Sequence, residues 1–270
     1  MQIKSYPPIT SSLRHHKNIK KNLLIKNDKI IKKLIFSIRR NFNRSSLFGH
    51  ITISNKSCGA KYLYRRLDIT NEKNKLGILL FSSYDPNRNS FISLNFDLLQ
   101  NTFFYILGTK NVSSGSIIGL NLDKLKLIHL GFQTFLKNMP HGIAFHSLSF
   151  CSNKKQYAKA AGTYCHLIDC RENICFVRLP SGKLIKILGT CIGIVGVVSN
   201  SKHKFTSLGK AGRARLNGFR PHVRGIAKNP VDHPHGGRTN GGCSPKTPWG
   251  KPTLGKKTKK LNKKNLYIKN

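Results

Sequence analysis

Short apolar runs separated by turn residues dominate the first part of the chain after residue 48. These runs are rich in Ile, Leu, Phe and Tyr, and clusters of Asn, Gly, Asp and Pro separate them; they occupy residues 51–54, 62–69, 77–84, 90–96 and 103–108. Such runs are typical of β-strands, and YDPNR (84–88) has the composition of a turn. Five short strands at this spacing predict a small β barrel over residues 49–121.

A second group of apolar runs follows over residues 122–200. Weak helical spacing at 122–136 predicts a link into this group, and the runs that predict strands lie at 142–150, 162–168, 174–179, 184–188 and 192–198. Ser181-Gly182 has the composition of a hairpin turn between two of them. We therefore predict a mainly β fold with two consecutive small β barrels.

The N-terminal residues 1–48 have a different pattern and are predicted to form a basic extension. Its apolar residues recur at helical spacing with Lys and Arg between them, at Leu23, Ile30, Ile31, Leu34, Ile35, Ile38 and Phe42. Three interpretations compete: a basic amphipathic helix against RNA or a protein, an organelle targeting segment, and a poorly ordered tail. The sequence leaves all three open.

The C-terminal residues 201–270 are predicted to form a second extension. Glycines and prolines punctuate residues 209–257, so no helix or strand of ordinary length can run through them. The segment is poor in large apolar side chains and cannot bury a core of its own. From Asn173 to the C-terminus the only carboxylate is Asp232. A polyanionic partner is therefore expected to order this backbone.

The charge of the whole chain supports that expectation. The 48 Lys and Arg against 9 Asp and Glu give a formal charge of +39 and a pI of about 10.4. Neutralising phosphates and releasing their counterions turns such charge into binding energy. The longest mostly apolar run, 184–198, contains Lys186 and is shorter than the ~18–20 residues that span a bilayer. Nucleic acid is the favoured partner, and no membrane insertion is predicted.

The 7 cysteines form no Cys-x-x-Cys motif, and no secretory signal precedes them. Cys165, Cys170 and Cys175 recur at a spacing of five. A zinc site is one interpretation, and free thiols in or beside strands are the favoured one. Free thiols imply a reducing compartment.

Residues 231–237, VDHPHGG, form the most distinctive polar cluster. With His222 and Cys243 it could be drawn as a metal site, but His-x-His around a proline is not a usual ligand pair and a second acidic ligand is missing. A catalytic histidine polarised by Asp232 is a second interpretation. We favour a third, in which His233 and His235 recognise RNA while Gly236 and Gly237 let the backbone approach closely. No catalytic residue, metal or cofactor is therefore predicted.

Two other basic segments also have alternative interpretations. GKPTLGKK (250–257) nearly spells a phosphate-binding loop, but Lys257 stands where Ser or Thr must hold magnesium. YAKAAGT (157–163) is either a solvated loop or a segment that approaches RNA closely. Arginines are better candidates than lysines for specific contacts, because the guanidinium group grips phosphate with two hydrogen bonds.

Several of these stretches resemble the family of universal large-subunit ribosomal protein two. The longest is GKAGRARLNGFRPHVRGIAKNPVDHPHGG (209–237), followed by TPWG (247–250) and GKKTKK (255–260). Supporting matches are SYDPNRNSFISL (83–94), YILG (105–108), NMPHG (138–142), KAAGTY (159–164) and VRLPSGKLIKI (177–187). The resemblance covers most of the chain from about Arg44 onward.

The resemblance implies an oligonucleotide-binding-type β barrel, then an SH3-like β barrel, then an extension embedded in large-subunit rRNA near the peptidyl-transferase region. It implies a structural role in assembly and subunit association. The histidine to which the family assigns importance falls in the HPH element, at His233 as first choice or His235 as second. The expected partners are large-subunit rRNA, neighbouring ribosomal proteins and small-subunit rRNA at the interface. The residues predicted to contact RNA are Arg88, Lys159, Arg213, Arg215, Arg220, His222, Arg224, Lys228, Asn229, His233, His235, Gly236, Gly237, Arg238, Lys246, Trp249, Lys251, Lys256 and Lys257.

This sequence departs from the family pattern at the Gly-rich, His-bearing loop before the YRR strand, which is reduced here to NKSCGA (55–60). Two functions from other classes stay open: a metal-dependent enzyme acting on nucleic acid, and a sequence-tolerant DNA binder. The first needs a constellation of carboxylates or a metal, and the acid-poor C-terminal half supplies almost no carboxylates. Abundant Ile, Lys and Asn indicate AT-rich coding, so a mitochondrion is the favoured location, with a plastid or the bacterial cytoplasm as alternatives.

Overall fold

The computed structural model describes residues 2–20, 24, 33–37, 43–68, 75–120, 129–149, 156–238 and 242–255. The chain divides into two compact units. The first unit comprises Met1–Arg39, Tyr62–Lys210 and Asn265–Asn270, and the second comprises Arg40–Lys61 and Ala211–Lys264. The second unit therefore joins two segments that lie far apart in the sequence.

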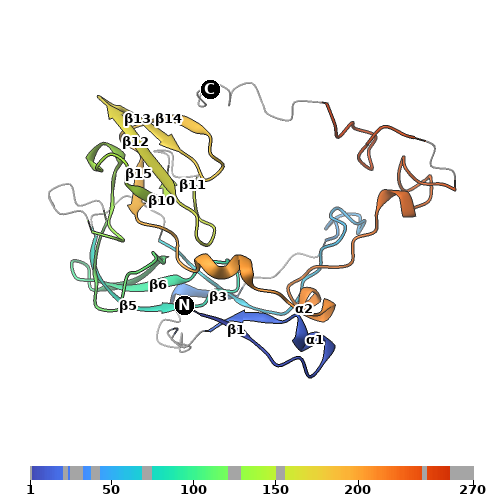
Figure 1. The fold of residues 1–270 in the computed structure, drawn as a ribbon, viewed down its shortest axis with the longest axis horizontal. Coiled ribbons are helices and arrows are strands. Elements are labelled where there is room, and N and C mark those ends of the chain that lie inside the picture. Colours follow the sequence, from blue (N-terminus) through green and yellow to red (C-terminus); the bar gives the residue numbers. More distant parts are fainter. Residues whose placement is uncertain are drawn as a thin grey trace. The chain divides into compact units, whose positions relative to one another are not determined.

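The first unit carries the strands, and the predicted mainly β fold is confirmed (Figure 1). They are β1 (Ile3–Ser5), β2 (Lys17–Ile19), β3 (Ile35–Ser37), β4 (Leu63–Arg65), β5 (Lys75–Ser83), β6 (Ile92–Asp97), β7 (Thr102–Leu107), β8 (Ile117–Leu120), β9 (Gln133–Phe135), β10 (Ala144–Ser149), β11 (Gln156–Tyr157), β12 (Cys165–Arg171), β13 (Ile174–Arg178), β14 (Leu184–Leu188) and β15 (Ile192–Val195). The helices are short: α1 (Ser11–Arg14), η2 (Leu136–Asn138), η3 (Ser201–Phe205), α2 (Ala211–Leu216) and η4 (Gly225–Ala227). Within the described ranges, none of them has the length and apolar character needed to cross a membrane.

The main sheet follows the order β14-β13-β12-β10-β15-β9-β8-β5-β6-β7, with β11 beside β10. Its two halves meet where β8 pairs in parallel with β9, at Leu120 and Gln133. A closed barrel requires its first and last strands to pair, whereas β14 and β7 end this path. Each half fits the expected oligonucleotide-binding and SH3-like arrangement, but the hydrogen-bonded sheet is open and not two closed barrels.

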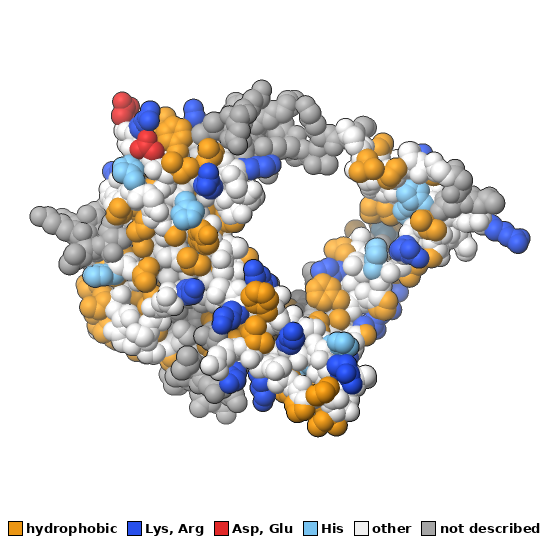
Figure 2. Space-filling model, in the orientation of Figure 1, with side chains coloured by type: hydrophobic (Ala, Val, Ile, Leu, Met, Phe, Trp, Pro, Cys, Tyr) orange, Lys and Arg blue, Asp and Glu red, His pale blue; other side chains and the backbone are white. Residues whose placement is uncertain are grey.

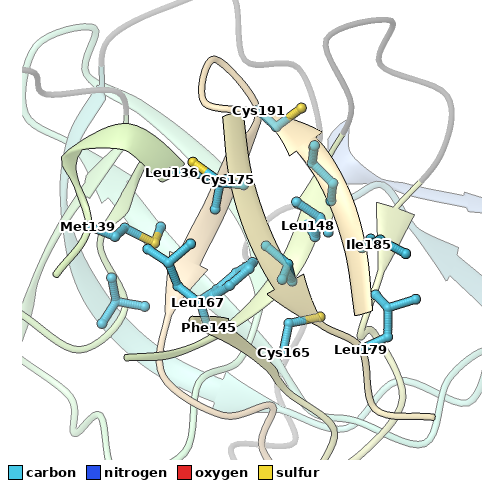
Figure 3. Packing of buried hydrophobic residues seen from close by; sticks show 13 residues of the cluster. Leu136, Met139, Phe145, Leu148, Cys165, Leu167, Cys175, Leu179, Ile185 and Cys191 are labelled. Carbon is cyan, nitrogen blue, oxygen red and sulfur yellow. The ribbon is translucent and has the colours of Figure 1, made fainter. Parts of the chain in front are cut away.

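Alternation along the strands builds the core of the second half. In β13, Cys175 and Val177 are fully buried between partly exposed neighbours, and β14 buries Ile185 and Ile187 in the same way. Because successive side chains point to opposite faces of a strand, the buried set gathers on one side of the sheet. Figure 3 shows this set converging with Phe145 between the strands.

The first half has two smaller clusters on its strands. One contains Leu79, Phe104, Ile106 and Ile118, and the other contains Phe81, Ile92, Leu94 and Tyr105. β6, which lies between β5 and β7 in the sheet order, is buried along most of its length.

Both predicted turns are confirmed. Gly182 lies at φ +82°, a region that favours glycine, and its N–H donates to the Leu179 carbonyl at 2.9 Å. At 84–88 the Arg88 N–H donates to the Asp85 carbonyl at 3.4 Å. These turns connect β13 to β14 and lead from β5 towards β6.

Three secondary-structure predictions are wrong. Residues 51–54 form an isolated bridge at Ile51, two bends and a turn instead of a strand, since this segment folds with the second unit and not with the sheet. The described part of the 122–136 link, from residue 129 on, contains strand β9 because β15 pairs with it. The N-terminal helical pattern lies largely outside the described residues, and its described part Ile35–Ser37 is strand β3, paired with β4.

The prediction of free thiols is also wrong for two cysteines. Cys170 and Cys175 lie opposite each other on β12 and β13 with Cα atoms 4.1 Å apart, and they form a disulfide. The five-residue spacing of the two cysteines does not by itself predict this disulfide. The pairing follows only once a tight turn at residues 172–173 places the two strands side by side. Cys165 and Cys243 are free thiols, and burial raises the pKa of Cys165 to about 12. The inferred reducing compartment therefore has no support from Cys170 and Cys175.

Candidate nucleic-acid interface

The second unit is held together by hydrogen bonds between its two segments. The Ser57 N–H donates to the Gly218 carbonyl and the Ala60 N–H to the Leu216 carbonyl, both at 2.8 Å. The Lys56 ammonium lies 4.9 Å from the centroid of the Phe219 ring. Sequence patterns gave no sign that residues 43–60 and 213–220 pair, because neither segment has an apolar period.

Helix α2 and the residues after it display the predicted arginines. Arg215, Arg220 and Arg224 are exposed, and Arg213 is half-buried. α2 spans only Ala211–Leu216 and ends at the glycine-containing turn before Phe219. Arg213 and Arg215 thus lie on a very short helix, and Arg220 and Arg224 lie on the irregular backbone that follows it.

Residues 225–237 form a closed loop, called here the HPH loop. The Asp232 N–H donates to the Asn229 carbonyl at 3.0 Å, and the Gly237 N–H donates to the Lys228 carbonyl at 3.2 Å. A Cβ at Gly236 would overlap the Asn229 carbonyl group. Gly236 is therefore required where the loop closes on its own backbone, a reason the sequence alone did not suggest.

His233 lies inside this loop, with 8% of its surface exposed. Its Nδ1 accepts the His235 backbone N–H at 3.0 Å, and a Cβ at Gly225 would strike its ring. Desolvation lowers the pKa of His233, and the nearby His235 and Lys228 lower that pKa further. A neutral imidazole suits this position because Nδ1 must act as an acceptor.

His235 is tied to the segment that follows the HPH loop. Its Nε2 accepts the Lys246 backbone N–H at 3.0 Å, and its ring stacks edge-on to the His233 ring at 4.7 Å between centroids. The two histidines therefore connect residues 225–237 to residues 244–246. Both histidine side chains therefore fix the backbone of residues 225–237 and of residues 244–246, from which the neighbouring side chains project.

The exposed side chains of this region include cations, the Trp249 ring and aliphatic residues such as Val231. Trp249 is 79% exposed. The other exposed residues from the predicted RNA-contact set are His222, Asn229, Arg238, Lys246 and Lys251, while Lys228 and Gly237 are half-buried. Lys256 and Lys257 lie outside the described residues. Figure 2 shows Lys and Arg side chains recurring over the face in view, with acidic side chains at one place among the described residues there.

The residues considered for metal binding do not converge. Over the described ranges, no group of three or more His, Cys, Asp or Glu side chains could hold a metal ion. Asp232 is exposed, whereas His233 is buried, and within those ranges no ion pair joins Asp232 to a histidine. The polarised histidine that a catalytic site requires is therefore not assembled by the described side chains.

The two predicted contacts in the first unit have different surroundings. The Arg88 Nε donates to the fully buried Asp85 carboxylate at 2.6 Å, and the Arg88 side chain is 20% exposed. Lys159 is exposed, and desolvation followed by repulsion from Arg88 lowers its pKa. Arg88 thus serves the fold through Asp85, while Lys159 is available to an anion.

The glycine of the YAKAAGT segment approaches the chain itself. Gly162 lies at φ +71°, and a Cβ there would come within 2.8 Å of the Ser201 Cα. Its N–H lies 3.2 Å from the Val198 carbonyl. Gly162 is therefore explained by packing within the first unit, whereas Ala160 is exposed and Lys159 is the outward cation of the segment.

Comparison with known proteins finds similarity over nearly the whole chain. Residues 31–119 match the family model "Ribosomal Proteins L2, RNA binding N-terminal domain", and residues 129–250 match "Ribosomal Proteins L2, C-terminal domain". The chain is 40% identical to large ribosomal subunit protein uL2 of Wolbachia pipientis, over 100% of this chain and 98% of the relative. It is 39% identical to the uL2 protein of Rhodospirillum rubrum (99% and 96% covered) and 40% identical to that of a Caulobacter strain (84% and 82%).

Proposed function

Because the chain belongs to the uL2 family of large ribosomal subunit proteins, we propose that the exposed cations of its second unit bind large-subunit rRNA. The family makes the protein a structural, non-enzymatic constituent of the large subunit of a bacterial-type ribosome.

The excess of exposed arginines over carboxylates in the C-terminal part of the chain supports this proposal. From Asn173 to the C-terminus the only carboxylate is Asp232, while Arg215 is exposed near the end of the short helix α2 and Arg220 and Arg224 are exposed on the irregular backbone after it. Unpaired guanidinium groups repel one another, and phosphates neutralise them with two hydrogen bonds each. An RNA backbone therefore supplies what the second unit lacks.

We propose that the HPH loop contacts rRNA through a backbone conformation that its histidines hold fixed. His233 and His235 hold its backbone, so that Asn229, Arg238 and Lys246 face outward. We propose that the loop supports the peptidyl-transferase region through its shape, while the reaction belongs to the RNA. The proposed further contacts are neighbouring ribosomal proteins and small-subunit rRNA, where the protein supports subunit association.

We propose a mitochondrion as the location of this ribosome. Abundant Ile, Lys and Asn support that proposal, and so does the similarity to alpha-proteobacterial uL2 proteins such as that of Rhodospirillum rubrum. Co-sedimentation of the protein with large subunits from purified mitochondria tests it. Recovery with plastid or cytoplasmic ribosomes alone would contradict it.

The salt dependence of binding tests the proposed contact residues. Full-length protein is titrated with a large-subunit rRNA fragment at several salt concentrations, and log K is plotted against log salt. Arg220→Gln is expected to reduce the slope by about 0.7–0.9, the value for one lost phosphate contact. Arg171→Gln is the matched control, since this exposed arginine pairs with Asp169 at 2.8 Å on the β12–β13 hairpin. Equal slopes for Arg220→Gln and the wild type would refute the assignment of Arg220.

A further inference from the structure

The loop at residues 44–51 in the second unit is closed by its own hydrogen bonds. The Ser45 N–H donates to the His50 carbonyl at 2.9 Å, and the Gly49 N–H donates to the Ser45 carbonyl at 3.1 Å. Gly49 lies at φ +65°, where glycine is favoured, and Arg44 pairs with Ile51 at the base of the loop. The loop has a defined shape before any partner binds.

This closed loop presents its apolar side chains to solvent. Leu47 is 84% exposed and Phe48 is 81% exposed, although they are neighbours. The Phe48 ring stacks on the His50 ring, with centroids 6.2 Å apart and 26° between the planes. Two adjacent exposed apolar residues on a preformed loop suit a contact surface, because contiguous exposed apolar area marks interaction sites, whereas scattered single residues do not.

The charges around the loop select the kind of partner. Arg44 lies at its base, where its Nη1 donates to the Gly49 carbonyl at 3.0 Å, and Lys56 follows in the same segment. Over the described residues of the second unit, Asp232 is the one acidic side chain. A partner that reaches Phe48 must therefore tolerate positive charge and offer a flat apolar face.

An unpaired nucleobase has both properties, because it has a π-face and its chain carries phosphates. We propose that Phe48, supported by His50, is a stacking platform for an unpaired base of RNA. This site rests on the proposed function and adds a base contact to the phosphate contacts assigned above. Residues 44–51 lie within the stretch that matches the RNA-binding N-terminal domain.

The preformed loop also explains why the contact is effective. A loop that is ordered in the free protein loses little conformational freedom when a base stacks on it. Phe48 is 81% exposed and its ring contacts the neighbouring His50 ring, so replacing its side chain removes the platform and buries or uncovers little else. An aliphatic residue in its place keeps apolar area but has no π-face, which separates base stacking from general apolar contact.

Photo-crosslinking of the full-length protein tests the proposal. The probe is a short single-stranded RNA containing thiouridine, and crosslinked peptides are identified by mass spectrometry. The wild type is expected to crosslink within residues 44–51, and Phe48→Leu is expected to lower that yield by about fivefold or more, the factor for losing one stacked base. Phe103→Leu is the matched control, because Phe103 is 40% exposed on β7 and lies outside the loop. A duplex of the same length is expected to crosslink weakly at the loop, since its bases are already stacked.

The outcomes separate this proposal from the function on which it rests. Wild-type protein that retains RNA but crosslinks only outside residues 44–51 would overturn the stacking platform and leave rRNA binding intact. Wild-type protein that retains no RNA would overturn the proposed function itself. If Phe48→Leu crosslinks normally while Leu47→Ala no longer co-sediments with large subunits, the loop docks in an apolar pocket of a protein and the proposal is wrong.

Discussion

The buried histidine of strand β10 makes the stability of the first unit depend on pH. His146 has no exposed surface, and its Nε2 lies 2.9 Å from the Thr109 Oγ1 while its Nδ1 lies 3.0 Å from the Ser147 Oγ. Burial lowers the pKa of His146 from 6.5 to about 3. Both partners are hydroxyl groups, so neither compensates a positive charge on the ring.

The sign of the effect follows from the direction of this pKa shift. Since the folded pKa of His146 is the lower one, the unfolded chain binds the proton first as the pH falls. Stability from the neutral ring is fully present above pH 6.5 and is lost as the pH falls towards 3. The slope is about 1.4 kcal/mol per pH unit, so about 2 kcal/mol is lost between pH 7 and pH 5. That is a large share of the ~5–15 kcal/mol typical of a folded domain.

Denaturant unfolding at pH 7 and pH 5 measures this loss. His146→Gln keeps a side chain that can reach Thr109 but does not titrate, so the variant is expected to lose about 2 kcal/mol less than the wild type on acidification. His222→Gln removes an exposed imidazole and is the control that should keep the wild-type pH dependence. If His146→Gln and the wild type lose equal stability between the two pH values, protonation of His146 is not the cause of the acid destabilisation.

Two further predictions concern the HPH loop. Gly236→Ala is expected to open it, because the new Cβ overlaps the Asn229 carbonyl group; hydrogen exchange at residues 225–237 should accelerate, whereas Gly212→Ala, with no atom within 4 Å of its Cβ, should leave that exchange unchanged. Unchanged exchange in Gly236→Ala would contradict the closure seen here. His233→Ala is expected to leave rRNA affinity nearly intact, since many phosphate contacts remain, but to impair peptide-bond formation by reconstituted large subunits. Loss of most of the rRNA affinity from this single change would refute that view.

Alternation and turn composition predicted most of the main sheet. The hairpin at Ser181-Gly182 and the turn at 84–88 follow from local rules, because each depends on a few adjacent residues. The pairing of β8 with β9 and the joining of residues 43–60 to residues 213–220 did not follow from any pattern. Those contacts depend on backbone groups of segments that have no hydrophobic period, and sequence periodicity carries no information about them.

The candidate site was predicted by residue type, and the structure sorts those residues by what surrounds them. Arg88 and Arg220 look equivalent in the sequence, yet Arg88 holds the buried Asp85 at 2.6 Å and Arg220 is exposed. Removing Arg88 leaves a buried carboxylate with only the more distant Arg65, at 3.6 Å, as an ion-pair partner among the described residues. An arginine that compensates a buried charge is needed by the fold even where RNA lies near.

The same distinction applies to the two histidines that dominate the sequence motif. A histidine that contacts RNA directly must expose a ring nitrogen, but His233 is 8% exposed and its Nδ1 already accepts the His235 N–H. We therefore expect its effect on RNA to pass through the backbone that it holds, and so through the direction in which Asn229 and Lys246 point. In that case the motif specifies a loop shape, because the histidines stabilise the backbone that we propose RNA contacts from outside.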